Sequence, residues 1–448
     1  MNLLLLLLGL RLWSAPTATS CFTRVFVAIS AFSVEMQLVT WLGVGSLRTL
    51  VLLNVAVAGV LWFAWPPVPE TDATARARAF AGPSLLAALP LAALVLALNI
   101  YLPLEAADPY HLDKVAHIET TGTLTYAPQG DQKTNILNPT YELLLADLRQ
   151  IPAAGPGLVR VHGVLSLLLY LLTLACVREM LGARDNWVWA LLLAVPVLFN
   201  QLVLLKNDLL VAMPGLAVLA WVVTRAGTAP WREVAWAAWL AGLTTAIKPT
   251  SLPIVVVFAA AIAIHRRADW RPYAAAAGGG LLGLAVAGLG FTLFENLRVY
   301  GGLMPVQDIS GRNIGVAAVA TSVFRFGISL VDLGLVTRVM WPGRGGWGGT
   351  FGLPLIWAGA VLVLRPTRDA RVTLLAAGAC FLMFGAAFPD ADLAHRLVLG
   401  PGLLLIGVAA HTVSHDETRH AWLRPAAVAV LVLSAAQILR SAVEYVRR

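Results

Sequence analysis

Charged residues are scarce in this chain. Only 12% of its residues are Asp, Glu, Lys or Arg, whereas 59% are hydrophobic. Apolar runs of about 20 residues recur along the whole sequence, which excludes a soluble domain carrying a single anchor. Short segments of alternating polarity are lacking, so helices must satisfy the backbone hydrogen bonds in lipid. We therefore expect an all-α polytopic membrane protein.

Cysteines are few and dispersed. Cys21, Cys176 and Cys380 are the only three in the chain, and each lies in or beside an apolar run. No two of them have the spacing of a zinc or redox motif, so we interpret them as small apolar residues.

The net charge of +8 does not indicate a nucleic-acid partner, because of where the arginines lie. Most of them fall in short connections between apolar runs, as the positive-inside rule predicts for cytoplasmic loops. These connections are 76–78, 178–184, 225–232, 266–271, 365–371 and 419–424. We expect a multi-pass protein of a bacterial cytoplasmic (inner) membrane.

The first twenty residues, MNLLLLLLGLRLWSAPTATS, contain no Lys or Arg before the apolar run 3–8. A secretory signal peptide normally carries positive charge at that point. We therefore favour a retained hydrophobic lead-in, although small residues follow the run as they would before a cleavage site.

Hydropathy predicts about thirteen membrane spans, within a range of about 11–14. They are 25–44, 47–65, 81–102, 157–177, 187–204, 208–224, 233–247, 251–264, 273–294, 350–364, 372–388, 397–411 and 425–441. The segment 320–341 contains Arg325, Asp332 and Arg338, which favours an interfacial helix. We divide the chain into an N-terminal extension (1–80), a membrane core (81–412) and a C-terminal part (413–448).

Lysine is rarer still, and its placement is unusual. The only four lysines are Lys114, Lys133, Lys206 and Lys248, and all are expected on the outer side. That side also holds the long loops 103–156 and 295–349. A charge that opposes the positive-inside bias needs a local reason, such as an acidic partner or an anionic ligand. The alternative is chance combined with snorkelling to the lipid headgroups.

The first outer loop begins with a concentration of charge, EAADPYHLDKVAHIE at 105–119. Asp108 followed by proline is a helix start signal, and apolar residues then recur at helical spacing. We expect an amphipathic helix over 109–120 on the outer membrane surface. His111, Lys114 and His117 follow at steps of three along one flank of this helix.

Metal binding by this helix is the less favoured interpretation. Asp113 and His117 have the i, i+4 spacing that places two ligands on one helix face. No second cluster completes the site, so we predict no zinc site. A divalent cation held by carboxylates stays open as a cofactor.

Several motifs, in order and on a common side, resemble those of the GT-C superfamily of membrane glycosyltransferases. They are ADPYHLDKVAHIETTGTL (107–124), LLKNDLLVAMPG (204–215), GLTTAIKPTSLP (242–253), FENLRVYGGLMP (294–305) and AHRLVLGPGLLL (394–405). The resemblance covers 81–412. It implies a GT-C-like bundle with a juxtamembrane helix in the first outer loop. It also implies transfer of a hexose or pentose from a polyprenyl-phosphate donor to a glycan, lipid or protein acceptor during cell-envelope polysaccharide synthesis or glycosylation.

The resemblance also implies roles for individual residues. Asp108 would be the general base that activates an acceptor hydroxyl, with inversion at the sugar. Lys206, Lys248 and Arg396 would clamp the departing lipid phosphate. Further substrate-binding residues would be Tyr110, His111, Lys114, Asp208 and Asn296. The alternative for the basic residues is pairing with Asp208, Asp390 or Asp392.

Two other classes of function stay open. A transporter or flippase for lipid-linked glycans would place ionisable groups deep within spans. Such groups are rare here, and Glu35 and Arg24 in the N-terminal extension are the exceptions. A non-catalytic assembly subunit would have the same hydropathy but no ligand at the outer loop.

Overall fold

Every regular element of the described chain is a helix. The computed structural model describes residues 15, 17–43, 47–65, 83–101, 109–123, 138–149, 158–183, 186–203, 207–266, 269–303, 316–331, 350–387, 398–415 and 422–446. Within these ranges there is no strand. The prediction of an all-α chain is confirmed for this part of the protein.

Nineteen helical elements make up these ranges. They are α2 (Ala18–Trp41), α3 (Leu47–Ala64), α5 (Pro83–Tyr101), α6 (Pro109–Thr121), α8 (Thr140–Arg149), α9 (Leu158–Met180), η3 (Trp187–Leu192), α10 (Pro196–Val203), α11 (Asp208–Arg225), α12 (Trp231–Ile247), η4 (Pro249–Ser251), α13 (Leu252–His265), α14 (Arg271–Val286), α15 (Leu289–Tyr300), α16 (Val316–Leu330), α18 (Leu353–Leu364), α19 (Arg368–Ala387), α20 (Leu399–His415) and α21 (Leu423–Val446). Most connections between them are short.

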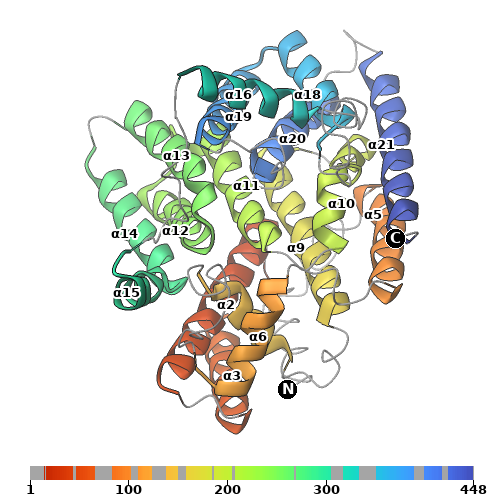
Figure 1. Cartoon of the computed structure of the whole chain (residues 1–448). Coiled ribbons are helices and arrows are strands. Elements are labelled where there is room, and N and C mark those ends of the chain that lie inside the picture. Colours follow the sequence, from red (N-terminus) through yellow and green to blue (C-terminus); the bar gives the residue numbers. More distant parts are fainter. Residues whose placement is uncertain are drawn as a thin grey trace.

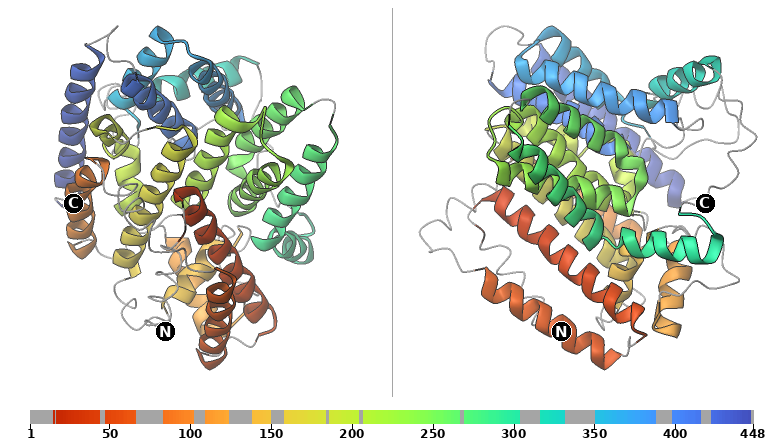
Figure 2. Two further views of the ribbon diagram at one scale, coloured as in Figure 1. Left: turned by 180° about the vertical axis from the view of Figure 1, so that it is seen from behind. Right: turned by 90° about the vertical axis from the view of Figure 1, so that its left-hand side faces the viewer.

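The helices form a bundle around α11 (Figure 1). This helix packs against α9, α12 and α20, and its side chains are buried along almost its whole length. Being apolar on all sides, α11 suits a central position. The N-terminal helices α2 and α3 form an outer layer, in which α2 contacts α9 and α3 contacts α2 (Figure 2).

Helices α12 and α14 touch backbone to backbone. A Cβ atom at Gly279 would lie 2.2 Å from the Ala235 carbonyl oxygen, and one at Gly283 only 2.1 Å from that of Trp239. The two glycines are four residues apart, so they share one face of α14. Small residues at this spacing allow membrane helices to approach closely without a side chain between them.

Five described helices are long and apolar enough to cross a membrane. They are Ala18–Trp41, His162–Met180, Asp208–Arg225, Arg368–Ala387 and Leu423–Arg440. The bent pair α14 and α15 would make a sixth if it forms one span. In the other apolar helices, the stretches whose side chains the structure describes are 10–17 residues long, for example Thr49–Ala64 of α3 and Ala88–Leu98 of α5. These helices indicate a membrane protein, whereas the count of about thirteen spans stays a prediction.

Two of the expected spans are not continuous helices. Over 187–204 the chain forms the 3₁₀ helix η3 and then α10, which begins at Pro196. Over 273–294 it bends by 60° between α14 and α15, where Gly288 adopts a φ of +68°. The prediction of one uninterrupted helix is wrong in both places. Proline removes a backbone donor, and a left-handed glycine redirects the chain.

Basic residues divide between the two ends of the bundle. Helices α11 and α12 run antiparallel. Arg225, at the end of α11, therefore lies at one end of the bundle, and Lys248, after the end of α12, lies at the other end. Arg266 Nε donates a 3.2 Å hydrogen bond to a carbonyl in the turn after α11, and Arg368 lies against the same turn. These arginine connections thus share one end, as the sequence predicts. Their cytoplasmic location stays a prediction.

The structure describes only the first part of the segment 320–341. Helix α16 covers Val316–Leu330, so it begins before the predicted segment, and residues 332–341 lie outside the described ranges. Its Ser322 hydroxyl donates a 2.8 Å hydrogen bond to the Gly385 carbonyl of α19. A helix is therefore confirmed over the first half of the segment, and its interfacial position stays a prediction.

Candidate functional site

The candidate site is built around α6 and α8. Val115 and Ile118 of α6 are buried against Leu143 and Ala146 of α8. Helix α6 ends at Gly122, whose φ of +66° is the left-handed conformation that commonly ends helices. The predicted helix over 109–120 is therefore present, whereas its position on a membrane surface stays a prediction.

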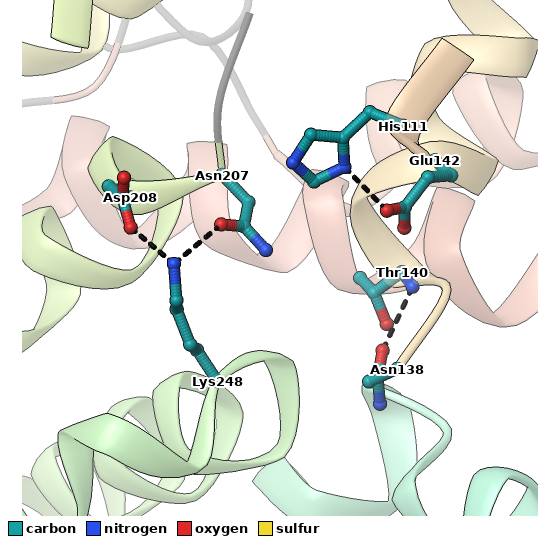
Figure 3. A network of polar contacts seen from close by, with 7 residues as sticks. All are labelled: His111, Asn138, Thr140, Glu142, Asn207, Asp208 and Lys248. Atoms are coloured by element: carbon teal, nitrogen blue, oxygen red, sulfur yellow. Dashed lines mark hydrogen bonds and ion pairs between the residues drawn. The ribbon is translucent and has the colours of Figure 1, made fainter. Parts of the chain in front are cut away.

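Two of the three residues on the polar flank of α6, His111 and Lys114, are buried. His111 Nδ1 lies 2.6 Å from Glu142 Oε1 of α8, and each of these side chains is only 1% exposed (Figure 3). Lys114, one turn further along α6, is buried as well. These two residues therefore do not form an open polar face on α6, because α8 covers them and supplies a carboxylate.

Burial and charge compete at this contact. Burial alone would raise the pKa of the Glu142 carboxyl, but the Lys114 ammonium and His111 outweigh it and hold that pKa below its ordinary value. Burial lowers the pKa of the Lys114 ammonium, and the Glu142 charge only partly offsets that effect. Glu142 therefore stays ionised at neutral pH and compensates the positive charge on α6.

Tyr141 extends this polar cluster to α9. Its ring contacts His111 edge-on at 4.9 Å between ring centroids and His162 at 5.9 Å. His162 Nε2 in turn lies 3.3 Å from the Ser166 hydroxyl. Three helices thus share one line of polar and aromatic contacts.

The sequence reasoning missed α8 and Glu142, although a signal was present. The side chain of Asn138 accepts a 2.9 Å hydrogen bond from the Thr140 amide, and Pro139 lies between them. This is the same Asx-Pro start that marks α6 at Asp108. The repeated signal predicts a second short helix in the same loop.

A second polar cluster is centred on Lys248. Its Nζ atom donates a 3.1 Å hydrogen bond to Asn207 Oδ1 and forms an ion pair with Asp208 (Figure 3). The Lys248 side chain is 20% exposed, whereas that of Asp208 is 2% exposed. The sequence left phosphate binding and aspartate pairing open for Lys248, and the structure shows the pairing.

The two clusters flank one apolar junction. Leu210, in the first turn of α11, packs against the buried residues shared by α2, α6 and α8. Phe291 of α15 packs against the same residues. The Lys248 and His111 clusters therefore lie at the same end of the bundle, which the right-hand view of Figure 2 shows for α6 and α15.

The break between α14 and α15 is fastened to this end by polar side chains. The Ala287 carbonyl accepts hydrogen bonds of 2.7 Å from both Asn138 Nδ2 and Thr140 Oγ1. Gln37 Nε2 of α2 donates a 3.1 Å hydrogen bond to the Val286 carbonyl. An interrupted helix frees carbonyl groups, and burial requires that they find donors. The start of α8 thereby fixes the position of the break.

Because Asn138 and Thr140 both donate to the Ala287 carbonyl, we expect that removing both donors costs more stability than the sum of the two single losses. Thr140→Val should cost less than about 1 kcal/mol, because Asn138 still donates to Ala287. The double variant with Asn138→Ala leaves that carbonyl without these donors and should cost about 2 kcal/mol or more. Thermal unfolding in detergent measures both, with the exposed Thr120→Val as control. A double variant no less stable than Thr140→Val would contradict the prediction.

Asn296 and its neighbours on α15 have structural partners. Asn296 is fully buried and donates a 3.1 Å hydrogen bond to the Leu303 carbonyl. Glu295 Oε2 pairs with Arg298 Nη2 at 2.7 Å. These contacts stabilise the end of α15, and the role of Asn296 in substrate binding stays a prediction.

Several predicted site residues lie outside the described ranges. They are Asp108, Lys206 and Arg396. Tyr110 belongs to α6 by its backbone, but its side chain is also outside the description. Of the predicted site, the structure brings His111, Lys114, Asp208 and Lys248 to one end of the bundle.

No evident metal centre occurs among the residues that the structure describes. Within them, no three His, Cys, Asp or Glu side chains gather as ligands of one ion. Asp113, half of the metal pair considered from the sequence, is exposed on α6.

Comparisons with known proteins add no family to this picture. Searches against protein-family models, curated proteins and solved structures gave no match. The function must therefore be argued from the site itself.

Proposed function

We propose that the protein is a membrane glycosyltransferase that uses a sugar linked to polyprenyl phosphate. The observation that supports this is the gathering of His111, Lys114 and Lys248, with their acidic partners, at one end of an otherwise apolar bundle. A lipid-linked sugar phosphate has the matching character, since its chain is apolar and its head is polar and anionic. The site would face the periplasm or exterior.

The proposed reaction needs one base and several cations. The acceptor hydroxyl loses its proton to Asp108 and attacks the anomeric carbon, while the bond to the lipid phosphate breaks. The phosphate leaves as an anion, so basic groups stabilise it better than a second acid would. Lys248, with Lys206 and Arg396, would supply this charge, and attack opposite the leaving group inverts the sugar.

Lys248 can bind the lipid phosphate only if its ion pair with Asp208 leaves part of its ammonium group accessible. Its ammonium is paired with Asp208 but remains partly exposed, so an anionic group can approach it from the open side. Lys114 is buried beside Glu142 and would act through the position of α6 rather than by direct contact. The proposal thus assigns different tasks to the two lysines.

Sugar transfer by purified protein in lipid nanodiscs tests the proposal. With a radiolabelled polyprenyl-phosphate sugar, the wild type should release polyprenyl phosphate, and Asp108→Asn should lower turnover about 100-fold. The exposed Asp113→Asn is the matched control and should retain activity. Equal turnover by Asp108→Asn and the wild type would remove Asp108 from the mechanism.

Two observations favour a transporter of lipid-linked glycans as the second candidate. The 60° bend between α14 and α15 interrupts an apolar segment, and transporters commonly bind substrate at such interruptions. Glu35 is a buried acid within the candidate span α2. Reconstituted vesicles distinguish the candidates, since a transporter moves fluorescent lipid-linked glycan across the bilayer without cleaving it.

A further inference from the structure

Glu35 is a buried carboxyl group in a candidate membrane span. The residue is only 6% exposed, and among the residues that the structure describes neither of its carboxylate oxygens has a hydrogen-bond partner. An isolated carboxylate in an apolar environment is very unfavourable. Something must therefore compensate its charge or hold it in the neutral form.

A second carboxyl group lies beside it on α8. Asp147 Oδ1 accepts a 2.7 Å hydrogen bond from Asn54 Nδ2 of α3. Helices α2 and α8 pack against each other, and the Asp147 charge lies close enough to Glu35 to act on it electrostatically. Burial raises the pKa of the Asp147 carboxyl, and the hydrogen bond from Asn54 offsets only part of that effect.

The three side chains come from helices that meet at one packed junction. Met36 of α2, Leu50 of α3 and Ala146 of α8 belong to the same buried cluster. Met36 and Ala146 adjoin the two acidic residues in sequence, and Leu50 lies one helical turn before Asn54. The site is therefore held by the packing of these helices and does not depend on a loop.

The unused atoms of this junction are all oxygens. Besides both oxygens of Glu35, the amide oxygen of Asn54 is buried with no hydrogen-bond partner in the described ranges. Within the described part of the chain, no Lys, Arg or His side chain is paired with Glu35 or Asp147. Carboxylate and amide oxygens are the ligands that hard divalent cations prefer.

We propose that Glu35, Asn54 and Asp147 bind one hard divalent cation of the Ca²⁺ or Mg²⁺ class between α2, α3 and α8. In the bound state the Asn54 amide would be flipped, so that its oxygen takes the place of Nδ2 beside Asp147. Two carboxylates and one divalent ion give a neutral unit, which suits an apolar junction. Asp147 is only partly buried, so the ion would enter from its side. The bound ion would join the N-terminal layer to the helix that carries Glu142, independently of the proposed sugar transfer.

Manganese binding tests the site, because Mn²⁺ replaces such ions and its free form gives a strong electron paramagnetic resonance signal. The full chain is stripped with EDTA in detergent, dialysed and titrated with Mn²⁺ at neutral pH. We expect one ion per chain, and at least about tenfold weaker binding in Glu35→Gln and in Asp147→Asn. The exposed Asp113→Asn should bind as the wild type does. Equal binding by all four proteins, or no binding by the wild type, would overturn the proposal.

Asn54→Ala keeps the test decisive if a carboxyl variant fails to fold. It retains both carboxylates but removes the amide oxygen, so Mn²⁺ should bind more weakly while the variant remains folded. Ca²⁺ should also raise the melting temperature of the wild type more than that of Asn54→Ala. A wild-type melting temperature that changes with pH but not with Ca²⁺ or Mn²⁺ would show that a proton, and no cation, occupies the junction.

Discussion

Glu142→Leu is expected to destabilise the protein by about 3–5 kcal/mol, because it removes the carboxylate that compensates the buried charge of Lys114. The same substitution deprives His111 of its 2.6 Å partner. Breaking one side of a buried ion pair costs more than the pair itself contributes, since the remaining charge stays desolvated. Thermal unfolding in detergent, followed by circular dichroism, measures the loss.

A double variant separates charge from packing in this prediction. Lys114→Met combined with Glu142→Leu removes both charges and should recover more than half of the lost stability. Asp113→Leu on the exposed face of α6 is the matched control and should change stability little. The charge argument fails if the double variant is less stable than Glu142→Leu alone.

Much of the helical pattern could be predicted from hydropathy alone. Each expected span corresponds to a helix or to a pair of short helices, because apolar runs in lipid have few alternatives to helix. The start of α6 was predictable from Asp108 and Pro109, and its apolar face from Val115 and Ile118. These signals are local, so they can be read within one or two helical turns.

The pairing of charged residues could not be predicted, since the partners are far apart in sequence. Glu142 lies 31 residues after His111, and Lys248 lies 40 residues after Asp208. No local pattern around α6 indicates that α8 packs against its polar flank and buries His111 and Lys114. The sequence did indicate that Lys248 needs an acidic or anionic partner, but it could not choose between them.

The helix breaks were missed for a different reason. Hydropathy averages over a window and carries no information on φ, so the apolar run around Gly288 looks continuous. The conformation at Gly288 depends on donors from distant segments, including Gln37 and Asn138. Only the folded chain brings these donors to the carbonyl groups that the break exposes.

Gly283→Leu is expected to cost about 3 kcal/mol or more, the largest packing effect we foresee. Even the Cβ atom would lie 2.1 Å from the Trp239 carbonyl oxygen and 2.6 Å from the Leu243 amide nitrogen. Both are backbone atoms, so neither can rotate away, and α12 and α14 would have to separate. Lys248 follows α12 directly, so its pairing with Asp208 should weaken as well.

Gly278→Leu provides the matched control on the same helix. No atom of the described residues lies within 4 Å of a Cβ at Gly278, and this glycine is exposed, unlike Gly279 and Gly283, which face α12. The two variants share the glycine-to-leucine change in helix propensity, so the difference in their melting temperatures isolates the helix contact. Equal melting temperatures would mean that α12 and α14 do not approach this closely. A large difference would establish the contact that holds the end of α12, and with it Lys248, beside the start of α11.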